Sequence, residues 1–185
     1  MIIGITGTIG AGKGTVVEYL KTKGFKHYSA RDFWNEEIAR RGLVSDRDVM
    51  TTVANDLRSI HGPEYFAEEA LARAKKVGGN AVIESIRSVG EAEYLKKGKV
   101  LLWAVDADIQ KRYERITRRM SETDKISFEK FVADEKREWD NADPTKQNIA
   151  GVMKMADVVL TNNGTQEELF TQVEAALRQV QGKRS

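Results

Sequence analysis

Cysteine is absent from the 185-residue chain, which excludes disulfides, thiolate metal sites and cysteine nucleophiles. A reducing compartment is therefore the simpler expectation, and we predict a cytoplasmic protein. No apolar run approaches the ~20 residues that a membrane span needs, and the first residues lack the pattern of a signal peptide. Proline is scarce, with 2 residues, and no repeat or composition shift marks a boundary. The length fits one domain covering residues 1–185.

A strong charge of either sign is also missing. Lys and Arg total 30 against 28 Asp and Glu, which gives a formal net charge of +2. A dedicated nucleic-acid binder usually shows a clear basic excess. The sequence therefore predicts neither a nucleic-acid nor a membrane partner, and it does not indicate an oligomeric state.

Short apolar runs alternate with amphipathic or charged helical segments along the whole chain. Such runs, when they are apolar throughout, favour a parallel sheet covered by helices on both faces. We therefore predict an α/β fold of three layers with a five-stranded parallel sheet. The predicted strands are 1–6, 25–28, 81–83, 100–105 and 157–161. The predicted helices are one from Lys13, then 32–41, 47–60, 63–76, 91–97, 109–119 and 127–140, and a last one ending near Val180.

A glycine-rich stretch joins the first predicted strand to the first predicted helix. Its glycines allow backbone N–H groups to face an anion, and the start of the helix adds partial positive charge. Lys13 adds a mobile cation, and the spacing is that of a Walker A loop. We therefore predict binding of ATP with Mg²⁺. The predicted phosphate contacts are Gly7, Thr8, Gly10, Ala11, Gly12, Lys13, Gly14 and Thr15.

The end of this loop departs from the usual pattern. Gly14 follows Lys13, and the hydroxyl comes one place later at Thr15, so Thr15 is expected to contact phosphate or to reach the metal through water. The Gly-Lys-Gly-Thr ending resembles adenylate kinase and related nucleoside monophosphate kinases. That resemblance implies a P-loop kinase fold and transfer of the γ-phosphoryl group of ATP to a small acceptor.

The segment after the second strand is similar to the Ser-Thr-Gly-Asp-x-x-Arg acceptor segment of those kinases. Ser29 and Asp32 match it, whereas Ala30 and Asn35 replace the Thr and the Arg. Arg31 is a candidate for a displaced phosphate contact. Asp32 is a candidate acceptor-binding and catalytic residue; the alternative is that it caps a helix, and the two roles can coexist.

A second candidate segment, Val82 to Arg87, resembles the Asp-Gly-x-x-Arg segment of the same kinases. The ends of parallel strands face the ligand crevice. Glu84 is therefore a candidate for orienting magnesium waters or an acceptor hydroxyl, and Arg87 for gripping an acceptor phosphate. Arg58 is a further acceptor candidate, which places acceptor helices within about 30–76. A surface Glu–Arg pair is the alternative.

Arginines crowd the predicted helix 109–119. Arg115 and Arg119 are four residues apart and share a face. In the kinases that this chain resembles, arginines at matching places come from a lid over ATP, which implies a short lid at about 112–126. Both arginines are candidates for stabilising the transferred group; a solvated basic face is the alternative.

Other charged groups receive no role from the sequence. The acidic side chains of the predicted helix 127–140 are interpreted as surface charge, and no constellation surrounds either histidine. The acids are Asp134, Glu135, Glu138 and Asp140, and the histidines are His27 and His61.

Several segments also resemble archaeal-type adenylate-kinase-related proteins, and residues 156–169 are similar to the C-terminal part of dephospho-CoA kinases. We therefore expect a kinase acting on a nucleoside monophosphate. The alternative is a dephospho-CoA kinase, in which Asp32 or Glu84 acts as base on a ribose hydroxyl. A regulatory P-loop GTPase or motor-type ATPase is a third hypothesis, which lacks support from an Asn-Lys-x-Asp motif.

Overall fold

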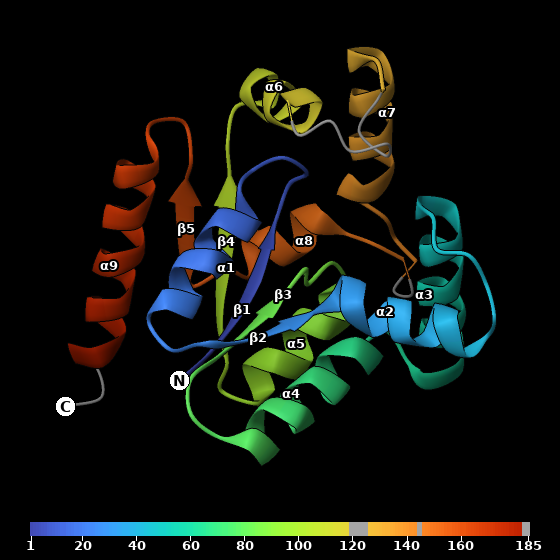
Figure 1. Ribbon diagram of the computed structural model, residues 1–185, viewed down its shortest axis with the longest axis horizontal. Helices are drawn as coiled ribbons and strands as arrows, with labels where there is room; N and C mark the ends of the chain where they lie inside the picture. Colours follow the sequence, from blue (N-terminus) through green and yellow to red (C-terminus); the bar gives the residue numbers. More distant parts are fainter. Residues whose placement is uncertain (119–125, 144–145, 183–185) are drawn as a thin grey trace.

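The computed structural model describes residues 1–118, 126–143 and 146–182 (Figure 1). Its sheet has five strands in the order β2-β3-β1-β4-β5, and every neighbouring pair is parallel. The five-stranded parallel sheet predicted from the sequence is thereby confirmed. The strands are β1 (Ile2–Gly7), β2 (Lys26–Ser29), β3 (Ala81–Glu84), β4 (Leu101–Asp106) and β5 (Val158–Thr161).

The helices follow the predicted order, with one addition. The six-residue α8 has no counterpart in the sequence prediction, because so short a helix shows no clear periodicity. The described helices are α1 (Lys13–Thr22), α2 (Ala30–Arg40), α3 (Arg47–His61), α4 (Tyr65–Val77), α5 (Val89–Lys97), α6 (Ile109–Arg118), α7 (Phe128–Trp139), α8 (Ile149–Lys154) and α9 (Gln166–Gly182).

The N-cap of α2 is Ser29, and not Asp32 as one interpretation of the sequence has it. Ser29 is the N-cap, and its side chain accepts a hydrogen bond from the backbone N–H of Asp32 at 3.3 Å. The interpretation of Asp32 as the capping residue is therefore wrong. A serine oxygen satisfies a backbone N–H of the first helical turn that has no partner within the helix.

Two separate apolar clusters cover the two faces of the sheet. On one face, residues of α1 and α9 such as Leu20 and Val173 pack against Ile3, Val82 and Val105 of the strands. On the other face, α4, α5 and α8 pack against alternate strand residues, and α2 and α3 extend this cluster outward. Figure 1 shows the resulting helix–sheet–helix layers.

All five strands run in the same direction, so their carboxyl ends lie along one edge of the sheet. The register places Ile5 of β1 and Ser29 of β2 on either side of Glu84, and Gly7 opposite Val105. Helices α6 and α7 lie beyond this edge in Figure 1. Parallel α/β folds bind ligands here, where the strand order reverses. Among the described helices, none combines the length and apolar character needed to cross a bilayer.

Candidate active site

The glycine loop wraps closely around its neighbours. Gly10 and Gly12 have φ angles of 78° and 100°, which side chains rarely tolerate. A Cβ atom on Gly10 would lie 2.5 Å from the carbonyl oxygen of Arg112, and one on Gly12 would lie 2.3 Å from Nδ2 of Asn162. Glycine is therefore required at both positions by conformation and by space.

Lys13 begins α1, and its ammonium group is held against the loop that precedes it. Nζ donates to the carbonyl oxygens of Gly7 at 2.9 Å and Thr8 at 2.8 Å. Burial and, after it, the nearby positive charge of Arg87 lower the pKa of Lys13 from 10.5 to about 7. Among the described residues, the ammonium of Lys13 thus bonds carbonyl oxygens rather than a carboxylate, and a bound phosphate would supply an anion.

This depressed pKa predicts a pH-dependent stability. Between pH ~7 and ~10.5 the unfolded chain binds a proton at Lys13 that the folded chain does not, so this group makes the protein more stable as the pH rises. Below pH ~7 the full cost of burying the ammonium is present. Lys13→Met should therefore be more stable than the wild type at pH 6, and this advantage should shrink by pH 9. Urea unfolding at both pH values measures it; an equal difference at both would contradict the pKa assignment.

Asn162 ties the loop to α6. The buried Asn162 side chain donates from Nδ2 to the carbonyl oxygen of Ala11 at 2.8 Å. Arg115 Nη2 donates to the carbonyl oxygen of Asn162 at 2.8 Å, while its buried Nη1 has no hydrogen-bond partner among the described residues. An unpaired, buried N–H beside a phosphate-binding loop suits an anion that arrives with the ligand. The structure thus places Arg115 against Asn162, which contacts the loop, and a role of Arg115 in transfer stays a prediction.

His27 and Glu84 form a contact that sequence reasoning missed. His27 Nε2 lies 2.9 Å from Glu84 Oε2, and the two side chains are 23% and 18% exposed. On β3, Glu84 alternates onto the same face as Val82, which packs with α1. Burial acts to raise the pKa of Glu84, but the hydrogen bond from His27 and the charges of Lys13 and Arg87 outweigh it, so the pKa is lowered. The register of β2 against β3 determines this pairing.

Loss of His27 should disturb the orientation of Glu84 without disturbing the fold. We expect His27→Ala to lower the kcat of ATP turnover by about tenfold. This is the effect typical of losing a partner that orients a functional carboxylate. His27→Gln keeps an N–H donor and should recover part of the loss. Equal kcat values for His27→Ala and the wild type would show that this contact does not orient Glu84.

Arg87 projects from the turn between β3 and α5 toward α7. Its Nη1 donates to Glu138 Oε2 at 2.9 Å and to Gln147 Oε1 at 3.0 Å. A small cavity of about 10 Å³, room for about one water molecule, lies beside this contact. Its lining combines the start of the glycine loop with α7 and α8: Gly7, Thr8, Ile9, Arg87, Glu135, Glu138, Trp139 and Ile149.

A second arginine contacts α7 in the same way. Arg112 of α6 is buried and forms a two-pronged ion pair with Glu135, and its Nε donates to the carbonyl oxygen of Ala107 at 2.7 Å. The interpretation of Glu135 and Glu138 as surface charge is therefore wrong, as it is for the buried Asp134. No local pattern reveals this, because it depends on where α7 lies over the sheet edge. Asp140 is exposed, as expected.

Thr8 and Asp106 form a further contact across the sheet edge. Thr8 Oγ1 donates to Asp106 Oδ1 at 2.8 Å. Asp106 ends β4, directly beside β1, and its backbone carbonyl accepts from Asn162 at 2.7 Å. This carboxylate therefore fixes the first residue after Gly7, which is a structural role at the phosphate loop.

Arg58 lies behind the turn that carries Arg87. It is 3% exposed, and its Nη2 lies 3.5 Å from Oε1 of the fully buried Glu91. Glu91 Oε2 accepts from the backbone N–H groups of Arg87 at 2.8 Å and Ser88 at 3.0 Å. Arg58 thus supports the backbone of Arg87 through Glu91, and direct acceptor contact by Arg58 stays a prediction.

The remaining predicted residues are not drawn together. Arg31 and Asp32 are exposed in the first turn of α2, and their side chains form no hydrogen bond or ion pair within the described part of the chain. Arg119 and the rest of 119–125, within the predicted lid at 112–126, lie outside the described residues. Their roles stay predictions.

The donor set fits a magnesium ion that arrives with ATP. Within the described ranges, no group of three or more His, Cys, Asp or Glu side chains could hold a metal. Mg²⁺ needs only one or two carboxylates when phosphates and water supply the other ligands. The lowered pKa of Glu84 keeps a carboxylate ionised near Lys13, and the hydroxyl of Thr15 lies in the first turn of α1.

Comparisons with known proteins agree with this geometry. A family model described as an AAA domain matches residues 3–140. A UPF0200 protein of Thermococcus sibiricus is 31% identical over 169 residues, which cover 88% of this chain and 86% of the relative.

Two solved structures share the fold. Dephospho-CoA kinase from Campylobacter jejuni aligns with a TM-score of 0.59 at 14% identity, covering 100% of this chain and 98% of that one. Shikimate kinase from Bacteroides thetaiotaomicron aligns with a TM-score of 0.58 at 13% identity, covering 98% of each chain. The predicted P-loop kinase fold is confirmed, while the likeness to adenylate kinases stays a prediction. The chain belongs to the UPF0200 family and carries the AAA domain of the matching model on a P-loop kinase-like α/β fold.

Proposed function

We propose that this protein transfers the γ-phosphoryl group of ATP to a small acceptor, a nucleoside monophosphate. The observation that carries the proposal is the placement of Lys13 and Arg87. Lys13 lies in the glycine loop, and Arg87 lies in the wall of a cavity that begins at the same loop. This arrangement supports a role for Lys13 at the donor phosphates and for Arg87 at the phosphate of an acceptor.

The residues at the sheet edge suit phosphoryl transfer by positioning. The bond between the γ-phosphorus and its bridging oxygen breaks, and a phosphate oxygen of the acceptor forms the new bond. That oxygen is already anionic, so no base has to remove a proton. Lys13 and the unpaired Nη1 of Arg115 meet the charge on the transferred group. When bound, Mg²⁺ supplies charge neutralisation on the donor phosphates.

One observation favours a second candidate, phosphorylation of a hydroxyl group as in a dephospho-CoA kinase. A hydroxyl acceptor must lose a proton, and Glu84 is an ionised carboxylate near Lys13 that could accept it. The fold is also that of the dephospho-CoA kinase structure. Arg87 suits a phosphate group in the acceptor for either candidate, because a guanidinium matches a phosphate.

The test is ATP consumption with a panel of acceptors. We expect a nucleoside monophosphate, among the ribo- and deoxyribonucleotides, to stimulate ATP turnover well above the rate without an acceptor. Stimulation by dephospho-CoA alone would favour the second candidate. Turnover that no acceptor changes would overturn both and favour a regulatory ATPase.

A further inference from the structure

We propose that Glu138 is a specificity-determining residue of the acceptor site: it holds the guanidinium of Arg87 in the empty site, and only a phosphate group displaces it. This inference rests on the proposed function, because it concerns the anion that Arg87 receives. It assigns a role to α7, which the sequence interpretation left at the surface.

The contact between the two residues is specific and largely shielded. Glu138 Oε2 lies 2.9 Å from Arg87 Nη1, and the side chains are 13% and 28% exposed. Gln147 Oε1 accepts from the same nitrogen at 3.0 Å. An acceptor that approaches Arg87 therefore meets a nitrogen already engaged by two oxygens.

Acidic side chains pair with the arginines beside the glycine loop in the empty site. Arg87 pairs with Glu138 and Arg112 with Glu135, and Asp106 Oδ1 lies 4.0 Å from Arg112 Nε. Paired charges avoid the large cost of an isolated buried charge. ATP and a phosphate-bearing acceptor bring further negative charge to these pairs. A carboxylate beside the acceptor is then repelled, and its arginine can pair with the acceptor instead.

Glu138 is the carboxylate in that position. It lines the cavity together with Gly7, Thr8, Ile9 and Arg87, next to the start of the glycine loop. Glu135 lines the same cavity, but it is bound to Arg112, whose guanidinium is also fixed by the carbonyl oxygen of Ala107. Release of Glu138 opens Arg87 toward the cavity, whereas release of Glu135 would leave Arg112 bound to the backbone.

The carboxylate of Glu138 competes with every free anion for the guanidinium of Arg87. Because Glu138 is part of the chain, it acts at a high effective concentration. A free carboxylate offers Arg87 the same chemistry and cannot compete at millimolar concentration. A phosphate dianion also binds a guanidinium through two oxygens but carries twice the charge of a carboxylate, so it can compete. The site thus distinguishes phosphate groups from weaker anions.

The experiment measures anion binding without turnover. The protein is saturated with Mg²⁺ and ADP to fill the glycine loop, and inorganic phosphate or acetate is then titrated. Trp139 reports binding by its fluorescence, because it lies next to Glu138, lines the cavity and is 39% exposed. Trp139→Phe should abolish the signal, and Arg87→Ala should abolish phosphate binding.

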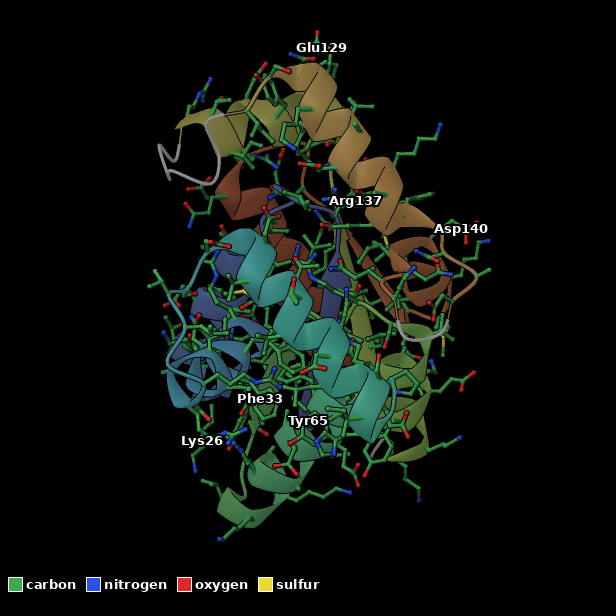
Figure 2. All side chains as sticks on the ribbon, turned by 90° about the vertical axis from the view of Figure 1, so that its right-hand side faces the viewer. Lys26, Phe33, Tyr65, Glu129, Arg137 and Asp140 are labelled. Atoms are coloured by element: carbon green, nitrogen blue, oxygen red, sulfur yellow. The ribbon has the colours of Figure 1, made fainter. Side chains whose placement is uncertain are left out.

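Glu138→Gln should strengthen phosphate binding by about tenfold, the factor expected if Glu138 engages Arg87 in nine of ten empty sites. The same variant should begin to bind acetate, so the ratio of its phosphate affinity to its acetate affinity should be smaller than in the wild type. Glu129→Gln removes an equal charge from the exposed far end of α7 and should change neither affinity (Figure 2).

Two results would overturn the inference. One is an unchanged or weaker phosphate affinity in Glu138→Gln, which would show that Glu138 does not compete for Arg87. The other is an equal gain in Glu129→Gln, which would show an effect of overall charge. Neither result depends on catalysis, so failure of the proposed function is detected separately by the acceptor panel.

Discussion

Lys13→Met is expected to reduce acceptor-stimulated ATP turnover by about a thousandfold or more. Lys13 is the cation that the glycine loop holds by the carbonyl oxygens of Gly7 and Thr8. Removing one positioned donor from a developing negative charge costs about 10²–10³ in rate, and here a full charge is lost. Steady-state kinetics at saturating ATP and acceptor measure the effect.

Two controls test whether the loss of activity comes from unfolding or from the removal of any lysine of α1. The variant should unfold at a higher urea concentration than the wild type at pH 6, because burial disfavours the lysine charge. Unfolding would therefore not explain the loss. Lys21→Met removes an exposed lysine of the same helix, whose partner is Glu18, and should keep full activity. Retention of more than a tenth of the wild-type rate in Lys13→Met would refute the loop assignment.

Arg87→Ala is expected to raise the acceptor KM by about 10–100-fold and to change the ATP KM much less. A hydrogen bond to a charged group contributes about 1.5–3 kcal/mol, which corresponds to this range. The variant also leaves Glu138 without Arg87 in the cavity wall, and its charge would repel an acceptor phosphate. The measurement is KM for each substrate with the other saturating.

Arg87→Lys should give an intermediate KM, because lysine keeps the charge but loses the planar fork. Arg73→Ala is the matched control: Arg73 is 46% exposed, bonds to Glu36 and lies over the ring of Phe33. The ring of Phe33 in α2, over which Arg73 lies, is itself beside the ring of Tyr65 in α4, with centroids 5.7 Å apart (Figure 2). An unchanged acceptor KM in Arg87→Ala would remove Arg87 from the site.

The donor side could be predicted from the sequence because its parts are contiguous. The residues from Gly7 to Thr15 form one loop and one helix start, so spacing alone predicts the position of Lys13 and the need for glycine at Gly10 and Gly12. The positions of Glu84 and Arg87 could also be predicted from the sequence. Both residues lie at or after the end of a predicted strand, and parallel strands end at one edge of the sheet.

Contacts between distant segments could not be predicted in this way. His27 meets Glu84 only through the register of β2 against β3. Glu138 meets Arg87, 51 residues away, only through the placement of α7 over the sheet edge. A charged helix has the same sequence pattern whether its acids face water or pair with arginines, so periodicity cannot distinguish the two.

Arg115 is an intermediate case. The resemblance to kinases predicted an arginine beside the donor phosphates, and the structure brings Arg115 to Asn162 at the glycine loop. Its partner there is a backbone carbonyl that no motif identifies. The sequence could predict an arginine here, but the contact of Arg115 with Asn162 could be identified only from the folded structure.

The most direct test of the central claim follows the label of ATP carrying ³²P in its γ-phosphate. The protein is incubated with this ATP, Mg²⁺ and the nucleoside monophosphate that most stimulates turnover, and the products are separated. The account predicts that the label appears in the corresponding nucleoside diphosphate and that Lys13→Met abolishes its formation. Label found only in inorganic phosphate would contradict the claim, because it would show ATP hydrolysis without transfer.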